Sequence, residues 1–153
     1  MEVSRGEAKE LIDSYFATYP AVADFIERAK EEARKKGYIE TAFHRRRYLP
    51  DINSHNAVVR GYAERNAVNA PIQGTAADII KIAMVRIARR LRDENLSVRM
   101  ILQVHDELNF SCPPSELPRL QAIVVEEMQN AWPDAKVPLT AECGTGENWL
   151  EAH

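Results

Sequence analysis

Apolar residues recur along the N-terminal part of the chain at the three- and four-residue spacing of amphipathic helices. Ser4 begins a capping-box pattern that predicts a first helix over about 7–18. Pro20 suits the first turn of a second helix, and Gly37 is placed to end it. A short strand is expected over 38–43, so this part of the chain is predicted to be mainly helical.

The middle of the chain carries two further helical patterns. Ser54 is placed to cap a helix that runs to about Asn69. Pro71 is expected to break it, because proline lacks the amide hydrogen that a helix interior needs. Thr75 is then expected to open a long helix to about Glu94, and Asn95 is expected to end it. The apolar stripe of this helix predicts a wide core-facing side: Ala76, Ile79, Ile80, Ala83, Ile87 and Leu91.

Between Ser97 and Cys112 the pattern changes to that of strands. An apolar run leads to His105-Asp106-Glu107, and the residues that follow alternate between apolar and polar, which predicts a β-hairpin with the ionisable residues at its turn. Two adjacent carboxylates at a rigid corner repel unless a cation or a donor offsets their charge, and Mg²⁺ prefers such oxygens. A polar turn that binds nothing is the alternative, because Asp is common in turns.

The C-terminal part is predicted to add one helix and one strand. Pro113-Pro114-Ser115 closes the hairpin and caps a helix, and a last strand is expected from about Val137 to Cys143. Gly144-Thr-Gly146 is not followed by the helix that a dinucleotide-binding fingerprint requires. The elements predict the α+β class, with a small antiparallel sheet of the hairpin plus the C-terminal strand, covered by helices on one face.

Composition adds the expectation of an ordinary soluble, cytoplasmic protein. The chain has 153 residues, enough for a single domain, with 45% hydrophobic and 28% charged residues. The sequence shows no membrane span and no signal-peptide pattern, and its two cysteines lack metal-ligand spacing. The net charge of −3 conceals a basic stretch over 34–60 and an acidic one from 101 onward. This split indicates separate faces for an anionic partner and for solvent or cations.

The basic stretch centres on Arg45, Arg46 and Arg47. Three consecutive arginines are not expected all to pair within the protein, so some should face water or an anion. Guanidinium groups bind phosphate in a bidentate manner, which makes a phosphate contact one interpretation. A salt-bridged surface loop is the other.

Four segments in register resemble the family A DNA polymerases, the family of bacterial DNA polymerase I. The first joins Gly37-Tyr-Ile-Glu-Thr to Arg45-Arg-Arg-Tyr-Leu-Pro-Asp51, and the second runs from Ala63 to Asp78 with the core Asn-Ala-Pro-Ile-Gln-Gly-Thr. The third is Gln103-Val-His-Asp-Glu-Leu108, and the fourth joins Val137-Pro-Leu to Gly144-Thr-Gly-Glu-Asn-Trp149. Together they cover nearly the whole chain.

The resemblance implies that this chain is only the C-terminal part of a polymerase domain. Residues 1–75 would form the end of the fingers and connecting helices, and 76–153 the palm. The sequence lacks the Asp-Tyr-Ser-type motif that supplies the other metal-binding aspartate of the family, and also the fingers helix that holds the incoming nucleotide. The piece is therefore expected not to polymerise alone, and to be a monomer that needs the remainder of the polymerase chain.

The resemblance assigns catalytic roles to the predicted hairpin turn. Asp106 resembles the catalytic aspartate that ligates the metal ions, and Glu107 its neighbour at the metal site. His105 is similar to the family histidine that contacts the primer end. The implied reaction adds a deoxynucleotide from a dNTP to the 3′ end of a primer in DNA replication and repair, by a two-metal mechanism with Mg²⁺. Template–primer DNA is the implied partner.

The resemblance also implies a DNA-facing row. Arg65, Asn69 and Gln73 look like the family residues that face the template–primer minor groove, and their spacing of four places them on one side of a helix if the proline does not disrupt it. All three can donate to minor-groove acceptors, which are nearly the same for every base pair. Local capping or interdomain contacts are the alternative. His44 departs from the glycine usual before the family's arginines.

Two other functions remain open from the sequence. The chain could be a non-catalytic fragment that holds duplex DNA through its arginines. Alternatively, Asp106 and Glu107 could serve a metal-dependent phosphodiesterase, for which Glu142 is the ready further carboxylate.

Overall fold

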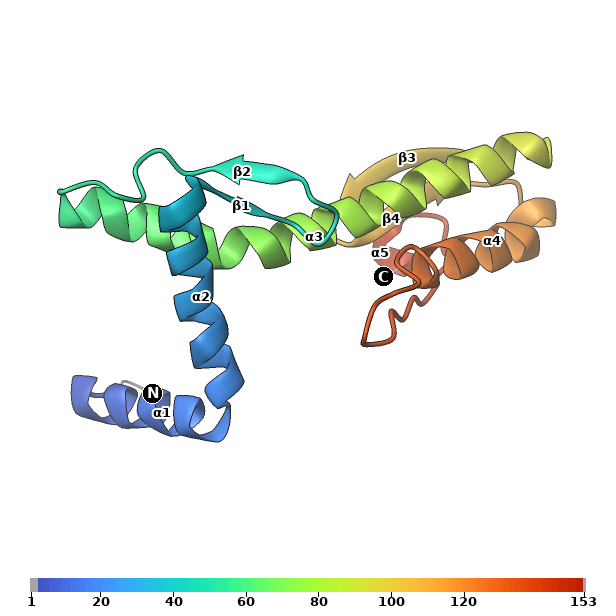
Figure 1. The fold of residues 1–153 in the computed structure, drawn as a ribbon. Coiled ribbons are helices and arrows are strands. Elements are labelled where there is room, and N and C mark those ends of the chain that lie inside the picture. Colours follow the sequence, from blue (N-terminus) through green and yellow to red (C-terminus); the bar gives the residue numbers. More distant parts are fainter. Residues whose placement is uncertain (1–2, 153) are drawn as a thin grey trace. The chain divides into compact units, whose positions relative to one another are not determined.

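The computed structural model describes residues 3–152. The chain divides into two compact units, Met1–Thr75 and Ala76–His153, and the long helix α3 contributes to both. The elements are mixed helices and antiparallel hairpins, so the predicted α+β class is confirmed (Figure 1). None of the helices in the described part of the chain is long and apolar enough to cross a membrane.

The first unit begins with helices α1 (Arg5–Thr18) and α2 (Pro20–Lys36). The predicted capping box is confirmed, because the Ser4 hydroxyl accepts from the Glu7 amide at 3.3 Å while the Glu7 carboxylate accepts from the Ser4 amide at 2.9 Å. That backbone hydrogen bond lowers the pKa of Glu7. Gly37 ends α2 with a left-handed φ of 76°, also as predicted.

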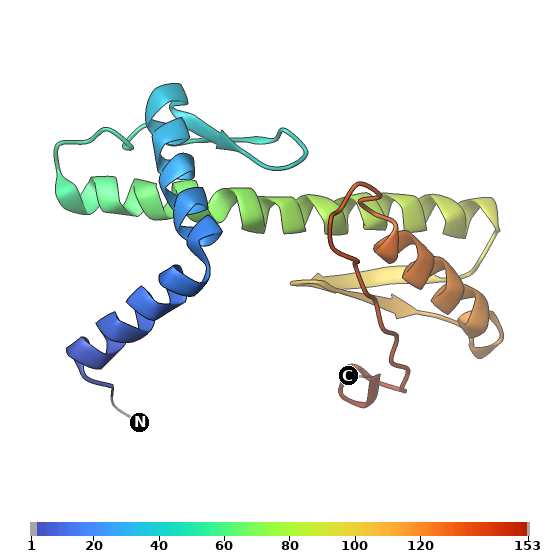
Figure 2. The same cartoon turned by 60° about the horizontal axis from the view of Figure 1, so that its bottom comes forward.

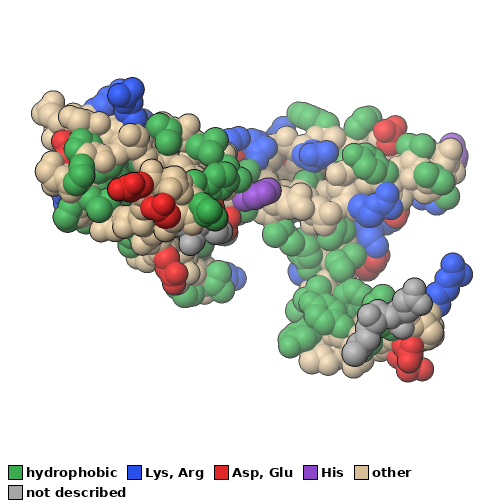
Figure 3. Space-filling model, turned by 180° about the vertical axis from the view of Figure 1, so that it is seen from behind, with side chains coloured by type: hydrophobic (Ala, Val, Ile, Leu, Met, Phe, Trp, Pro, Cys, Tyr) green, Lys and Arg blue, Asp and Glu red, His purple; other side chains and the backbone are tan. Residues whose placement is uncertain are grey.

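Helix α1 buries none of its residues, although its sequence is amphipathic. Hydrophobic side chains therefore gather in the open over α1, as Figure 3 shows. The large exposed ones are Leu11, Ile12 and Tyr15 of α1 and Tyr19 just after it.

A second hairpin lies in the first unit, where the sequence predicted only one strand. β1 (Tyr38–Glu40) pairs antiparallel with β2 (Arg46–Tyr48), so the predicted strand over 38–43 was too long and its partner was missed. The Thr41 hydroxyl accepts from the amides of Phe43 and Arg45, which turns the chain between the strands. The core beside this hairpin combines residues of α2, of β1, of the loop after β2 and of α3. They are Ala33, Ile39, Leu49, Ile52, Ala63 and Ala67.

Helix α3 (Ala57–Asp93) runs unbroken through Pro71, so the predicted break was wrong. An interior proline costs about 3 kcal/mol in an isolated helix, but packing on both sides holds this one together. Ala67, one turn before, is fully buried, and the Thr75 hydroxyl, one turn after, donates to the Pro71 carbonyl and accepts from the Ala42 amide of the hairpin turn. Tertiary contacts therefore override the local preference.

The ends of α3 have identifiable caps. Asn56, rather than the predicted Ser54, caps the first turn, since its side-chain oxygen accepts from the Val58 amide at 2.9 Å. At the other end Asn95 adopts a left-handed φ of 53°, and the Leu96 amide donates to the Leu91 carbonyl at 3.0 Å. This is the Schellman arrangement, and it confirms Asn95 as the stop.

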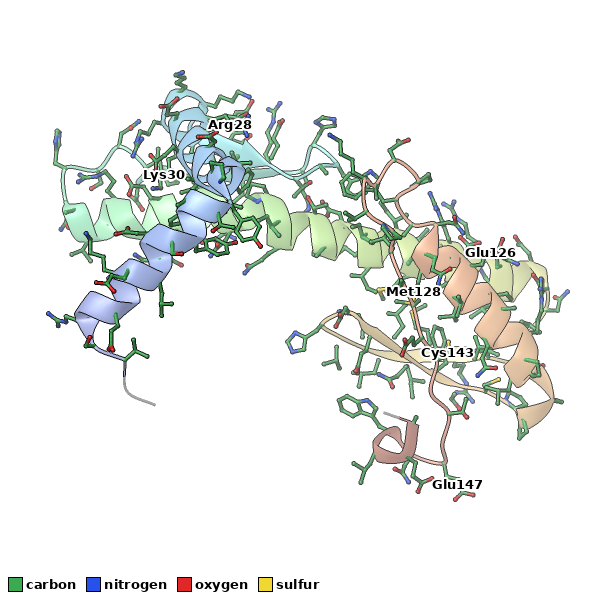
Figure 4. All side chains as sticks on the ribbon, turned by 90° about the horizontal axis from the view of Figure 1, so that it is seen from below. Arg28, Lys30, Glu126, Met128, Cys143 and Glu147 are labelled. Carbon is green, nitrogen blue, oxygen red and sulfur yellow. The ribbon has the colours of Figure 1, made fainter. Side chains whose placement is uncertain are left out.

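The second unit packs the hairpin β3 (Arg99–Val104) and β4 (Glu107–Ser111) with α4 (Leu117–Gln129) and the second half of α3 (Figure 2). Three residues of the predicted apolar stripe of α3, Ala83, Ile87 and Leu91, lie in this core with Ile123 and Val124 of α4. Ile79 packs against the core together with Met100, Leu108 and Phe110 of the hairpin. The prediction was wrong for Ala76, which is exposed, and Ile80 is buried outside this cluster. Arg90 of α3 donates to Glu126 of α4 at 2.6 Å. The Glu126 side chain is exposed on α4 beside the core (Figure 4). One face of the hairpin is thus covered by helices, as expected.

The predicted C-terminal strand does not form. Residues 137–143 are described without strand structure, and both sheets in the described residues have two strands. Val137 is 69% exposed, and Pro138 cannot donate to a ladder, so the alternating pattern finds no partner here. A short helix α5 (Trp149–Ala152) follows, and a Cβ at Gly144 would lie 1.7 Å from the Ala152 carbonyl oxygen. The Gly-Thr-Gly sequence therefore allows close backbone packing.

Candidate metal-binding turn and nucleic-acid interface

The ionisable residues of the β3–β4 hairpin lie at its turn, as the sequence predicted. Val104 pairs with Glu107, which leaves His105 and Asp106 as a two-residue turn. His105 has a φ of 51°, in the left-handed region that tight hairpin turns require at their first central position. The Gln103 side chain donates to the His105 carbonyl at 2.6 Å and braces the corner. The pairing of β3 with β4 next to the turn thus fixes where Asp106 lies.

This corner offers two carboxylates of different exposure. Asp106 is exposed at the tip, whereas Glu107 is half-buried as the first residue of β4. Hard oxygen ligands of this kind suit Mg²⁺, which is usually held by one or two carboxylates together with substrate phosphates. The donor set therefore fits a Mg²⁺ ion that is completed by other ligands.

A complete metal site is not present among the described residues. No group of three or more His, Cys, Asp or Glu side chains that could hold a metal occurs there. Glu142, the further carboxylate considered for a phosphodiesterase, lies exposed in the irregular C-terminal segment and does not complete such a group. The phosphodiesterase alternative therefore lacks its third ligand in the described chain.

The predicted row on α3 is intact, because the helix continues through Pro71. Arg65, Asn69 and Gln73 are all exposed, and their spacing of four places them on one side of α3. The Arg65 side chain forms no hydrogen bond or ion pair with the described residues, so its five N–H donors remain free. The row is thus a solvent-facing set of donors rather than a set of local caps.

The three consecutive arginines all have partners within the protein, contrary to expectation, yet all stay exposed. Arg45 donates to the Gly74 carbonyl at 3.0 Å, and Arg47 to the Asn66 side-chain oxygen at 3.4 Å. Arg46 donates to Glu40 at 2.8 Å and lies 4.6 Å from the centroid of the Tyr38 ring.

The partners of these arginines differ in charge. The hydrogen bond from Arg46 lowers the pKa of Glu40, so this pair is ionic over the physiological range. Arg47 has a neutral partner in Asn66 and keeps its positive charge available. The β1–β2 hairpin therefore presents a basic edge in which Arg46 is largely neutralised.

Sequence reasoning missed three residues that shape these sites. Glu40 and Asn66 hold two of the arginines, and Tyr62 lies beneath Arg65 on α3. The contact between Tyr62 and Arg65 could have been predicted, because residues three apart on a helix are neighbours on its surface. The other two contacts depend on the unpredicted strand β2 and had no local signal.

By fold and side-chain chemistry, the chain is an α+β protein of two units. The first unit carries exposed arginine and amide donors that suit an anionic partner, and the second carries two carboxylates at a hairpin turn. The sequence profile of DNA polymerase family A matches residues 1–151. The chain belongs to this family, as the sequence motifs predicted.

Individual relatives agree with this membership. DNA polymerase I of Geobacillus stearothermophilus is 48% identical over 99% of this chain, and the thermostable DNA polymerase I of Thermus thermophilus is 50% identical over 95% of it. The chain spans only 17% of the length of each of these relatives. Among solved structures, the POL domain of Pol1 from M. smegmatis in complex with DNA primer-template and dNTP has a TM-score of 0.94 at 45% identity, covering 98% of this chain and 26% of that one.

Proposed function

We propose that this chain is the C-terminal part of the polymerase domain of a DNA-directed DNA polymerase, which extends a primer 3′ end with deoxynucleotides. Support comes from family membership and from a relative solved with DNA primer-template and dNTP. The observation that carries the proposal is the two-residue turn, which holds Asp106 exposed beside Glu107. The substrate class implies action on DNA in the cytoplasm, and we expect a monomer.

In the second unit, Asp106 and Glu107 would hold Mg²⁺ as part of a larger ligand set. When bound, such ions activate the primer hydroxyl and stabilise the leaving oxygens. Asp106 supplies a carboxylate whose position is fixed by β3 and β4, and Glu107 adds negative charge beside it. His105, at the same tip, would contact the primer end as a hydrogen-bond donor.

The first unit would bind the duplex without reading its sequence. Arg65, Asn69 and Gln73 donate to minor-groove acceptors, which are nearly the same for every base pair. The edge formed by Arg45, Arg46 and Arg47 contacts backbone phosphate, which positions the duplex. The division of the chain near Thr75 supports assigning 1–75 to the fingers end and 76–153 to the palm.

We further propose that the chain alone does not polymerise, because the partner carboxylate of Asp106 must come from a longer polymerase chain. The test replaces the matching C-terminal segment of the Geobacillus stearothermophilus relative with this chain and measures primer extension. We expect extension by the chimera and none by the 153-residue chain.

The control variants locate the activity. Asp106→Ala in the chimera should reduce extension by at least about a thousandfold, since a carboxylate that holds the metal would be lost. Asp134→Ala removes another exposed aspartate and should leave extension unchanged. Normal extension by the Asp106→Ala chimera would refute the assignment of Asp106 as a metal ligand. Extension by the 153-residue chain alone would refute the proposal that it needs the rest of a polymerase chain.

A further inference from the structure

Arg65 differs from its neighbours on α3 in having no anionic partner. One residue earlier, Glu64 accepts from Arg34 at 2.7 Å and lies 3.8 Å from Arg60. In the described part of the chain no carboxylate or carbonyl binds Arg65. A long side chain without such a partner usually samples many rotamers, and this freedom is lost on binding.

The position of Arg65 is nevertheless defined by two neighbours on its own helix. Its guanidinium carbon lies 5.9 Å from the centroid of the Tyr62 ring, within the range of a cation–π contact. On the other side, one guanidinium nitrogen lies 3.7 Å from where a Cβ of Gly61 would be. The guanidinium thus lies back along α3, over an aromatic ring and a bare glycine.

We propose that Gly61 and Tyr62 form a seat that holds the Arg65 guanidinium for its contact with duplex DNA, which makes Tyr62 a positioning residue. The inference rests on the proposed function, in which Arg65 faces the minor groove. Contact with the ring face uses no N–H group, so all donors of Arg65 stay free for nucleic acid. Placing the side chain before DNA arrives reduces the entropy lost on binding.

The seat accounts for two residues that the row of Arg65, Asn69 and Gln73 does not explain, namely Tyr62 and Gly61. Tyr62 is 62% exposed on the same side of α3 as Arg65, where a large aromatic residue has no core to fill. Glycine inside a helix is unfavourable relative to alanine, but a large side chain at Gly61 would occupy the place of the guanidinium. Both residues therefore favour one arrangement of Arg65.

The first test examines the seat without DNA. Because an aromatic ring shifts the NMR signals of protons above its face, the Arg65 δ protons of the 153-residue chain should resonate upfield. Tyr62→Phe keeps the ring and should keep the shift, whereas Tyr62→Leu and Gly61→Leu should abolish it. Unshifted Arg65 protons in the unmodified chain would overturn the proposal.

The second test measures binding of the same chain to a primer–template duplex at low salt. An exposed cation–π contact is worth a factor of about two to five, so Tyr62→Leu should weaken binding by that factor and Tyr62→Phe should not. In an Arg65→Ala background, or on DNA with 3-deazapurines that lack the minor-groove acceptor, Tyr62→Leu should have no further effect. Tyr19→Leu, at an exposed tyrosine on another part of the chain, is the matched control.

The outcomes separate this inference from the proposed function. Equal weakening by Tyr62→Leu with and without Arg65 would mean that Tyr62 binds DNA itself, and would overturn the positioning role. Unchanged binding by Arg65→Ala, or no binding at all by the unmodified chain, would instead contradict the proposed DNA role of Arg65. The NMR result would still decide whether Tyr62 and Gly61 hold the guanidinium.

Discussion

Replacing Gly74 by alanine should destabilise the protein, although alanine is the better helix former. A Cβ at Gly74 would lie 2.6 Å from the Thr41 methyl carbon and 3.4 Å from a guanidinium nitrogen of Arg45. Thr41 is only 8% exposed, and its hydroxyl accepts from the amides of Phe43 and Arg45 at 3.2 Å each. The methyl group cannot rotate away without breaking these two hydrogen bonds, so the β1–β2 hairpin must shift from α3.

The magnitude follows from comparison with Gly61 on the same helix. There an added Cβ would lie 3.7 Å from its nearest neighbour, which is ordinary van der Waals contact. Gly61→Ala should therefore gain the helix-propensity term alone, about 0.5–1 kcal/mol of unfolding free energy. Gly74→Ala gains the same term but adds overpacking that costs about 1–3 kcal/mol. The two variants should thus differ by about 1–3 kcal/mol.

The assay is urea unfolding of both glycine variants, with Thr41→Ser as the rescue. Serine keeps the hydroxyl that turns the hairpin and removes the methyl that the new Cβ would meet. Gly74→Ala should consequently cost much less in the Thr41→Ser background than in the unmodified chain. Stabilisation by Gly74→Ala equal to that of Gly61→Ala, or no rescue by serine, would refute the reasoning.

Three further outcomes are expected. Gly37→Ala should lower the unfolding free energy by about 1–2 kcal/mol in thermal or urea unfolding, because the left-handed φ of 76° strains a residue with a Cβ. Glu40→Gln should release the charge of Arg46, and DNA binding measured against salt should become steeper by up to about 0.9 in log–log slope. The pKa of Glu94 is lowered by Arg119, so their contribution to stability is present above the usual carboxyl pKa and is lost as pH falls through the lowered value. The difference in unfolding free energy between the unmodified chain and Arg119→Ala should therefore shrink from pH 7 toward pH 3 if this coupling is real, and stay constant if it is not.

Sequence reasoning succeeded where the deciding interactions are local. The correct predictions were the Ser4 capping box, the Gly37 and Asn95 stops and a hairpin with His105-Asp106-Glu107 at its turn. All of these depend on residues within a few positions of each other. The resemblance to DNA polymerase family A was equally readable, because it rests on ordered motifs. Capping chemistry and motif order are thus properties of the sequence itself.

The errors arose where distant residues decide the outcome. Pro71 would end an isolated helix, yet contacts of Ala67 in the core and of Thr75 with the hairpin turn keep α3 continuous. The opposite error concerns 137–143, whose alternating pattern suits a strand but finds no neighbouring strand in the described chain. A strand needs a neighbouring strand to pair with, and the alternation of apolar and polar residues does not by itself provide one.

The partner of each arginine gives a physical basis for separating structural roles from the proposed DNA-binding roles. Arg34 and Arg90 each donate to a carboxylate on another helix, and Arg119 donates to Glu94 just after α3, so their charges are already neutralised within the protein. Counterion release requires a cation that is not already neutralised, which favours Arg47 and Arg65 over Arg46 as contacts to nucleic acid. Under the proposed function, the unbroken α3 therefore contributes to DNA binding as well as to the fold. It keeps Arg65 on the exposed side of the helix with Asn69 and Gln73, where its donors remain free.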